Sequence, residues 1–110
     1  MKNINSLKNS SEFKRVYEGG KSFATNDLIM YVLPCGGETR LGISVSKKVG
    51  NSVIRHRVTR LIRESFIACK EEIREGYFIV VIARPRAKEK KQQQIEFPFR
   101  TLLRRHKLVQ

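Results

Sequence analysis

The sequence has no tryptophan, two cysteines and two histidines among its 110 residues. Cys35 and Cys69 lie far apart without a pairing pattern, so we expect reduced thiols, as in a cytoplasmic protein. His56 and His106 have no cysteine or carboxylate cluster beside them, which argues against a protein metal site. Arrangements such as Ser/His/Asp or Cys/His are missing as well, so we predict no catalytic side chain.

Long apolar runs are also missing. No stretch approaches the roughly 18 apolar residues of a membrane-spanning helix, so we predict no transmembrane helix. Residues 1–11 contain no apolar stretch, and we expect no secretory signal there. The length fits a single domain over residues 1–110, with residues 1–8 flexible and residues 84–94 forming a loop.

Acidic residues are scarce: 10 of them face 23 lysines and arginines, for a net charge of +13. The excess is concentrated in two blocks. Residues 40–63 contain seven basic residues and no acidic one, and residues 84–110 contain nine basic and two acidic residues. Blocks of this kind indicate an electrostatic footprint for a polyanion, either nucleic acid or an anionic membrane.

The first half of the chain predicts a helix followed by strands. Asn9 is placed to cap a helix that runs to about Glu18, before Gly19 and Gly20 end it. The apolar run 28–33 predicts a strand covered on both faces, and residues 40–46 alternate apolar with Gly and Ser, which predicts a second strand. We expect these two strands to form a hairpin, with a weaker strand at 21–24. The small Gly and Ser face leaves room for something to lie close to it.

The second half predicts a helix, a strand and a helix. The long helix begins at Asn51 or Ser52 and is expected to end between Glu72 and Gly76, although its acidic last turns oppose the helix dipole without a local reason. Residues 77–83 form a buried strand, and a helical stripe resumes at Ile95. The order predicts an α+β, two-layer α/β sandwich.

The segment from Ser44 to Glu64 carries the chemistry. A helix N-terminus offers free backbone N–H groups to a phosphate, and arginines on the polar half of the helix can follow a nucleic-acid backbone. A solvated basic helix is the plain alternative, but such helices normally interleave glutamate, which is missing here.

This segment resembles the signature of the bacterial ribonuclease P protein subunit. The match runs through Ser46-Lys47-Lys48-Val49-Gly50-Asn51, then Arg55-His56-Arg57, then Arg60-Leu61-Ile62-Arg63-Glu64. Ser11-Glu12-Phe13, Val16-Tyr17 and Gly20 match the start of the family pattern, and Tyr31 falls in the matching strand. Two positions depart from the pattern: His56 stands for the usual asparagine and Thr59 for a usual basic residue.

The resemblance implies a fold like domain 2 of ribosomal protein S5, with a left-handed β-α-β crossover around the basic helix. It also implies a cytoplasmic ribonucleoprotein, an endonuclease in which a catalytic RNA removes the 5′ leader of precursor tRNA with RNA-bound Mg²⁺. The protein would be an RNA-binding domain whose partners are that RNA and precursor tRNA, with no membrane partner. Independently of the resemblance, the net charge of +13 predicts that the free protein binds anions such as sulfate or phosphate.

The resemblance also assigns residues to the two RNA partners. Those expected to contact the catalytic RNA are Lys47, Lys48, Arg55, His56, Arg57, Arg60 and Arg63. Those expected to line a cleft for the leader are Phe13, Tyr17 and Tyr31. Aromatic faces suit an extended single strand because bases stack on them, although core packing is the plain alternative for these three.

Two other functions remain open at this point. A basic ribosomal or RNA-assembly protein of the same fold would bind RNA without affecting precursor cleavage. A DNA-binding module would read the major groove with the helix 55–63, but the strand-rich order does not fit a helix-turn-helix.

Overall fold

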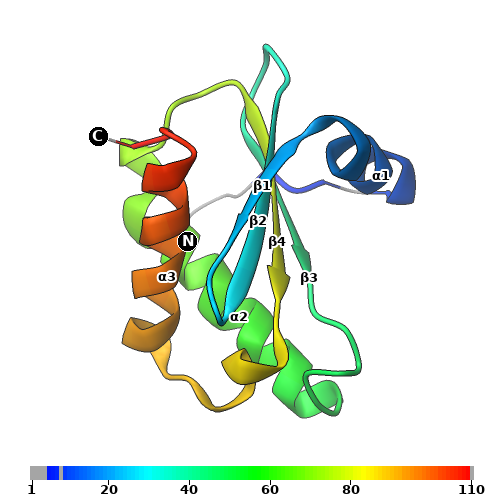
Figure 1. The fold of residues 1–110 in the computed structure, drawn as a ribbon, viewed down its shortest axis with the longest axis vertical. Helices are drawn as coiled ribbons and strands as arrows, with labels where there is room; N and C mark the ends of the chain where they lie inside the picture. The colour runs from blue at the N-terminus through cyan, green and yellow to red at the C-terminus, as the bar shows by residue number, and fades with distance from the viewer. Residues whose placement is uncertain (1–4, 8, 110) are drawn as a thin grey trace.

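A four-stranded sheet with the strand order β1-β2-β4-β3 forms the middle of the molecule (Figure 1). The computed structural model describes residues 5–7 and 9–109. In chain order the elements are α1 (Ser10–Gly19), β1 (Lys21–Ala24), β2 (Leu28–Pro34), β3 (Arg40–Ser44), α2 (Ser52–Cys69), η1 (Lys70–Glu72), β4 (Tyr77–Ala83), η2 (Pro85–Glu89) and α3 (Gln92–Arg105). The expected α+β class and element types are therefore confirmed.

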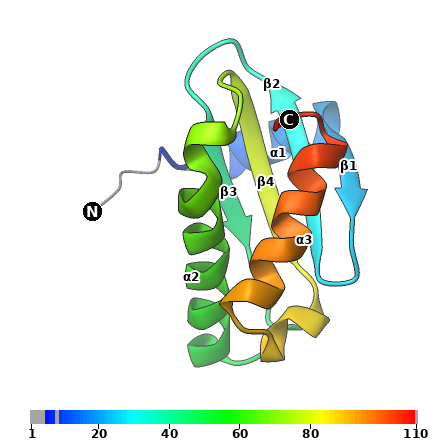
Figure 2. The same cartoon turned by 90° about the vertical axis from the view of Figure 1, so that its left-hand side faces the viewer.

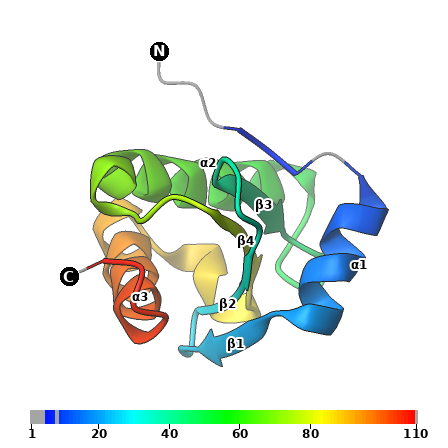
Figure 3. The same ribbon diagram turned by 90° about the horizontal axis from the view of Figure 1, so that it is seen from above.

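The helices lie on both faces of the sheet. α2 and α3 cover one face, and α1 lies against the other (Figures 1 and 3). The main core fills the space under α2 and α3, where Met30, Ile79 and Phe99 are fully buried. A smaller cluster around Val16 and Val80 forms under α1. α1 covers only one end of its face of the sheet and leaves the rest of that face open (Figure 1).

The expected hairpin between residues 28–33 and 40–46 is wrong. β4 lies between β2 and β3: it pairs antiparallel with β2, where Tyr31 faces Val80, and parallel with β3, where Gly42 faces the same Val80. The hairpin partner of β2 is the weaker strand β1. β4 is buried at Ile79, Val80 and Val81, so it takes a central position that a sequence-local pairing rule does not predict.

β3 and β4 are parallel neighbours joined through α2, and this crossover is left-handed (Figure 2). Crossovers between parallel strands are right-handed as a general rule. The left hand was therefore predicted by the family resemblance and not by the general rule. The arrangement brings the first turn of α2 to the end of the sheet where β3 finishes (Figure 2).

Both predicted caps are present. The Asn9 side chain accepts a hydrogen bond from the backbone N–H of Glu12 at 3.0 Å, and the Asn51 side chain accepts one from Ile54 at 3.0 Å. The long helix ends at Cys69, earlier than expected, so the acidic residues predicted for its last turns lie in η1, where a carboxylate oxygen of Glu72 is 3.4 Å from a guanidinium nitrogen of Arg100 on α3.

Two segments that were expected to be flexible or to form a loop, residues 1–8 and residues 84–94, contain ordered structure. Residues 5–7 lie beside β3, where the N–H of Leu7 bonds to the carbonyl of Leu41 at 3.1 Å; the remainder of the expected flexible range, 1–4 and 8, lies outside the described residues. The expected loop at 84–94 instead contains η2 and the first residues of α3. Pro85 fits the first turn of η2, since the missing N–H is not needed there.

Both cysteines are free, as expected. Burial raises the pKa of the Cys69 thiol to about 11, and the sulfur donates to the carbonyl of Ser65. Within residues 5–7 and 9–109, no helix is long and apolar enough to span a bilayer.

Candidate nucleic-acid interface

Three aromatic side chains gather where α1 meets the open part of the sheet. The ring centroids of Phe13 and Tyr17 are 6.3 Å apart, and those of Tyr17 and Tyr31 are 5.1 Å apart in an edge-to-face arrangement. Phe13 and Tyr17 come from successive turns of α1, whereas Tyr31 comes from β2. Tyr17 is 37% exposed, so the cluster presents ring surface to solvent as well as packing internally. The structure therefore brings together the three residues that were predicted to line a cleft.

Phe13 owes its position to a glycine on β3. A Cβ built on Gly42 would lie 2.7 Å from Cζ of Phe13, closer than a real Cβ comes to another atom, and 3.0 Å from a methyl group of Leu7. The small face seen in the alternation of residues 40–46 is thus the seat of the Phe13 ring.

The Tyr17 hydroxyl lies over the same face of β3. Burial raises the pKa of this phenol, and a side-chain hydrogen bond with Ser44 offsets part of the rise. The group stays neutral at physiological pH, and its hydroxyl remains a hydrogen-bonding group rather than a charge that would repel phosphate.

The sheet continues the aromatic surface. Register places Ile29, Ile82 and Ser44 in one row, next to the row of Tyr31, Val80 and Gly42. Ile29 and Ile82 are half-buried, because α1 does not cover them fully. An apolar floor beside the exposed ring of Tyr17 and the half-buried rings of Phe13 and Tyr31 suits the flat faces of unpaired bases.

The turn before α2 supplies two lysines. Val49 is buried and its N–H bonds to the carbonyl of Ser46 at 3.0 Å, which anchors the turn, while Lys47 and Lys48 are exposed. Gly50 allows close approach of Ile54, whose side-chain carbons would lie 2.8–2.9 Å from a Cβ at position 50. The turn therefore holds two cations beside the free N–H groups of the helix start.

The basic side chains of α2 leave the helix in several directions. His56 and Arg63 are exposed, and Arg55 is half-buried with a guanidinium hydrogen bond to the Gly50 carbonyl at 3.4 Å. Arg60 pairs with Glu64 one turn later at 3.5 Å, in a pair that is 61% and 47% exposed. Exposed pairs of this kind contribute little to stability, so Arg60 is available to a stronger anion.

Arg57 differs from its neighbours. Its guanidinium donates hydrogen bonds to the carbonyl oxygens of Lys88 and Lys90, in the segment after β4. It is the residue that ties the predicted basic helix to η2.

A hollow of about 140 Å³ joins the two predicted groups of residues. Thr59 and Arg63 border it from α2, Phe13 borders it from α1, and Gly42 forms part of its lining between them. The basic helix and the aromatic cluster therefore belong to one continuous surface across β3.

The sequence pointed to the small Gly and Ser face that includes Ser44, but it did not indicate η2 or its C-cap residue Lys90 as parts of this region. No local pattern could have linked η2 to Arg57, because the two are separated by the whole of β4. Within residues 5–7 and 9–109, no group of three His, Cys, Asp or Glu side chains is close enough to hold a metal ion.

Comparison with known proteins gives one consistent family. The sequence model of the family described as Ribonuclease P matches residues 1–107. The ribonuclease P protein component of Lachnoclostridium phytofermentans is 50% identical over 107 residues, which cover 94% of this chain and 90% of that protein. The corresponding protein of Alkaliphilus metalliredigens is 43% identical over 110 residues and 99% of each chain.

Solved structures agree with the sequence matches. The RNase P protein of Staphylococcus aureus superposes with a TM-score of 0.86 at 36% identity, over 98% of this chain and 100% of that one. The RNase P protein of Thermotoga maritima gives a TM-score of 0.84 at 27% identity, over 92% and 96%.

Proposed function

The chain belongs to the ribonuclease P protein component family, and from this premise we propose that its basic helix and its aromatic cluster hold two different stretches of RNA. Membership makes the chain part of an endoribonuclease complex with an RNA partner, with a role in processing the 5′ end of tRNA. The proposal concerns which surfaces perform that role.

The catalytic RNA is assigned to the start of α2 and the turn before it. Cations and free helix N–H groups are concentrated there, and both favour phosphate. The residues that would contact this RNA are Lys47, Lys48, Arg55, His56, Arg60 and Arg63, and Arg57, the seventh predicted residue, would act by holding the backbone at Lys88 and Lys90.

The 5′ leader of precursor tRNA is assigned to the aromatic cluster. Phe13, Tyr17 and Tyr31 present rings beside the open apolar strip of the sheet, and each stacked base contributes roughly 1–3 kcal/mol. The observation that carries the proposal is the hollow lined by both Phe13 and Arg63. A leader bound at the aromatic cluster could pass through this hollow and reach the helix that binds the catalytic RNA.

Mg²⁺ is assigned to the RNA. The ion prefers oxygen ligands, whereas the turn before α2 offers the ammonium groups of Lys47 and Lys48, and α2 offers mainly guanidinium and imidazole groups, with its carboxylate Glu64 paired to Arg60. The protein's own contribution is to bind and orient the two RNAs. Because precursor tRNA is made in the bacterial cytoplasm, we place the complex there.

Reconstitution tests the proposal. The cognate catalytic RNA should cleave precursor tRNA with multiple turnovers at physiological Mg²⁺ when the protein is added. Arg63→Glu should remove most of this stimulation, whereas Arg104→Glu, an equal charge reversal at the exposed far end of α3, should retain it. Unchanged cleavage on adding the wild-type protein would contradict the proposal and favour a ribosomal or RNA-assembly role.

A further inference from the structure

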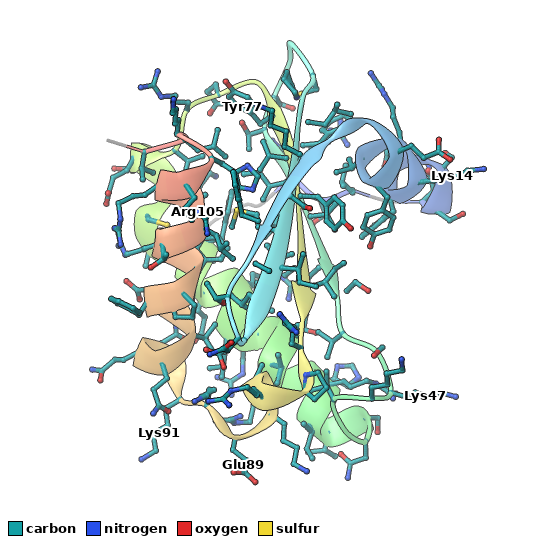
Figure 4. The ribbon with its side chains drawn as sticks, in the orientation of Figure 1. Lys14, Lys47, Tyr77, Glu89, Lys91 and Arg105 are labelled. Atoms are coloured by element: carbon teal, nitrogen blue, oxygen red, sulfur yellow. The ribbon has the colours of Figure 1, made fainter. Side chains whose placement is uncertain are left out.

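The two basic blocks of the sequence meet at one hollow, on the η2 side of α2. The hollow has a volume of about 430 Å³. It is lined by Lys48 from the turn before α2, by Arg86, Lys88 and Glu89 of η2, by Lys90 directly after η2, and by Gln94 of α3. Figure 4 shows Lys47 and Glu89 at this same end of the molecule, away from Lys14. We call it the η2 basin.

Positive charge exceeds negative charge in the η2 basin. Four cations line it against the single carboxylate of Glu89. One further carboxylate lies nearby: an oxygen of Asp27 is 3.9 Å from Arg86 and 4.0 Å from Lys90. Lys48 and Lys88 are exposed. A concave surface lined by one sign of charge focuses its field more strongly than the same charges on a convex face.

Arg57 gives the basin its shape. Its guanidinium bonds to the carbonyls of Lys88 and Lys90 and so fixes the backbone that carries two of the cations. Lysine could keep the charge of Arg57 but could not make this two-pronged contact.

We propose that the η2 basin is a second binding site for RNA backbone phosphates, and that Arg57 is its positioning residue. The basin lies on the η2 side of α2, whereas the hollow shared with Phe13 lies on the β3 side. The phosphates are therefore those of the catalytic RNA, which would contact both the start of α2 and η2, and not those of the leader. This inference rests on the proposed function and extends its footprint to the second basic block.

The test measures binding of the cognate catalytic RNA by the full-length protein across a salt series. Lys88→Ala should lower the affinity and reduce the slope of log K against log[salt] by about 1, as one lost phosphate contact does. Arg104→Ala removes the same charge from the same sequence block at the far end of α3, and should leave the slope unchanged. Equal changes in affinity and salt slope for the two variants would mean that the RNA is attracted by the overall charge, and would overturn the proposal that the η2 basin is a phosphate site.

The positioning role is tested with Arg57→Lys, which keeps the charge. This variant should lose affinity like Lys88→Ala, and the double variant should lose little more than either, since both disable one site. Additive losses would overturn the positioning role. Thermal melting of each variant should match the wild type at high salt, where a folding defect would still be visible.

Two further measurements distinguish a failure of the basin proposal from a failure of the proposed function. Arg60→Ala tests the outer face of α2: if it weakens RNA binding while Lys88→Ala does not, the basin is wrong and the proposed function stands. If neither variant weakens binding, both are wrong. Affinity of the assembled complex for precursor tRNA should be the same for Lys88→Ala and wild type; a selective loss there would overturn the assignment to the catalytic RNA.

Discussion

The ring of Phe13 rests on the bare backbone of Gly42. The two residues lie on different layers, one on α1 and the other on β3, and a Cβ at position 42 would be 2.7 Å from Cζ of the ring. Together with the packing of Val16 in the cluster around Val80, this contact holds α1 against the sheet and fixes the place of the Phe13 ring.

Gly42→Ala should therefore force Phe13 and Leu7 to move. We expect a loss of about 1–3 kcal/mol in the free energy of unfolding, the usual cost of overpacking, measured by urea denaturation. The matched control is Gly37→Ala, because nothing lies within 4 Å of a Cβ there, and it should stay within about 0.5 kcal/mol of the wild type. Identical urea midpoints for the two variants would contradict this packing.

The sequence indicated that something lies close to Gly42 but could not say what. Local signals were sufficient for the caps at Asn9 and Asn51 and for the extent of β2 and β4. They failed where a distant residue decides, as in the pairing of β4 with both β2 and β3, and in the contact of Arg100 with Glu72 in η1. The same limit applies to the interface: Arg57 reads as one more cation of a basic helix until its bonds to Lys88 and Lys90 are seen.

Truncation of the aromatic cluster should affect substrates according to their leaders. Tyr31→Ala should weaken binding of precursor tRNA with a long leader by roughly 1–3 kcal/mol, the value of one stacked base, and leave binding of leaderless tRNA unchanged. Phe97→Ala is the control, since Phe97 is 71% exposed on α3, in the layer on the opposite face of the sheet. Equal losses for both substrates would point to a packing role for Tyr31.

The Arg60–Glu64 pair allows charge to be separated from structure. Arg60→Ala and Glu64→Gln both break the same exposed ion pair, so each should change stability by less than about 1 kcal/mol. RNA affinity should fall with Arg60→Ala, with a smaller salt slope, and should not fall with Glu64→Gln. Parallel losses of RNA affinity would mean that the pair matters for its geometry and that Arg60 does not contact phosphate.

Anions should stabilise the free protein. Its net charge of +13 opposes the compact state, and a ligand that binds the folded form shifts the unfolding equilibrium in proportion to the logarithm of its concentration. The melting temperature should rise on adding sulfate or phosphate, and more than with sodium chloride of equal ionic strength. Binding predicts a steep rise at low concentration, whereas a merely linear rise, as expected from exclusion of the salt from the protein surface, would contradict an anion site.

His106 makes the stability of the fold depend on pH. Its Nε2 lies 2.9 Å from the carbonyl of Met30, and its ring packs edge-to-face on Phe23 at 4.8 Å. Burial lowers the pKa of His106 below its ordinary 6.5; the bond to Met30 opposes this shift, while the charges of Arg105 and Lys21 add to it.

The sign of the effect follows from the lowered pKa. As the pH falls below 6.5, His106 becomes protonated in the unfolded chain while it stays neutral in the folded chain. Its contribution to the free energy of unfolding is therefore fully present above pH 6.5 and is lost as the pH falls through the pKa of the folded state. Urea unfolding between about pH 7.5 and 5 should show the wild type losing stability over this window. His106→Gln, which cannot titrate there, should flatten that part of the profile, and His56→Gln, at an exposed position, should retain it. A His106→Gln profile as steep as that of the wild type would assign the acid sensitivity to other groups.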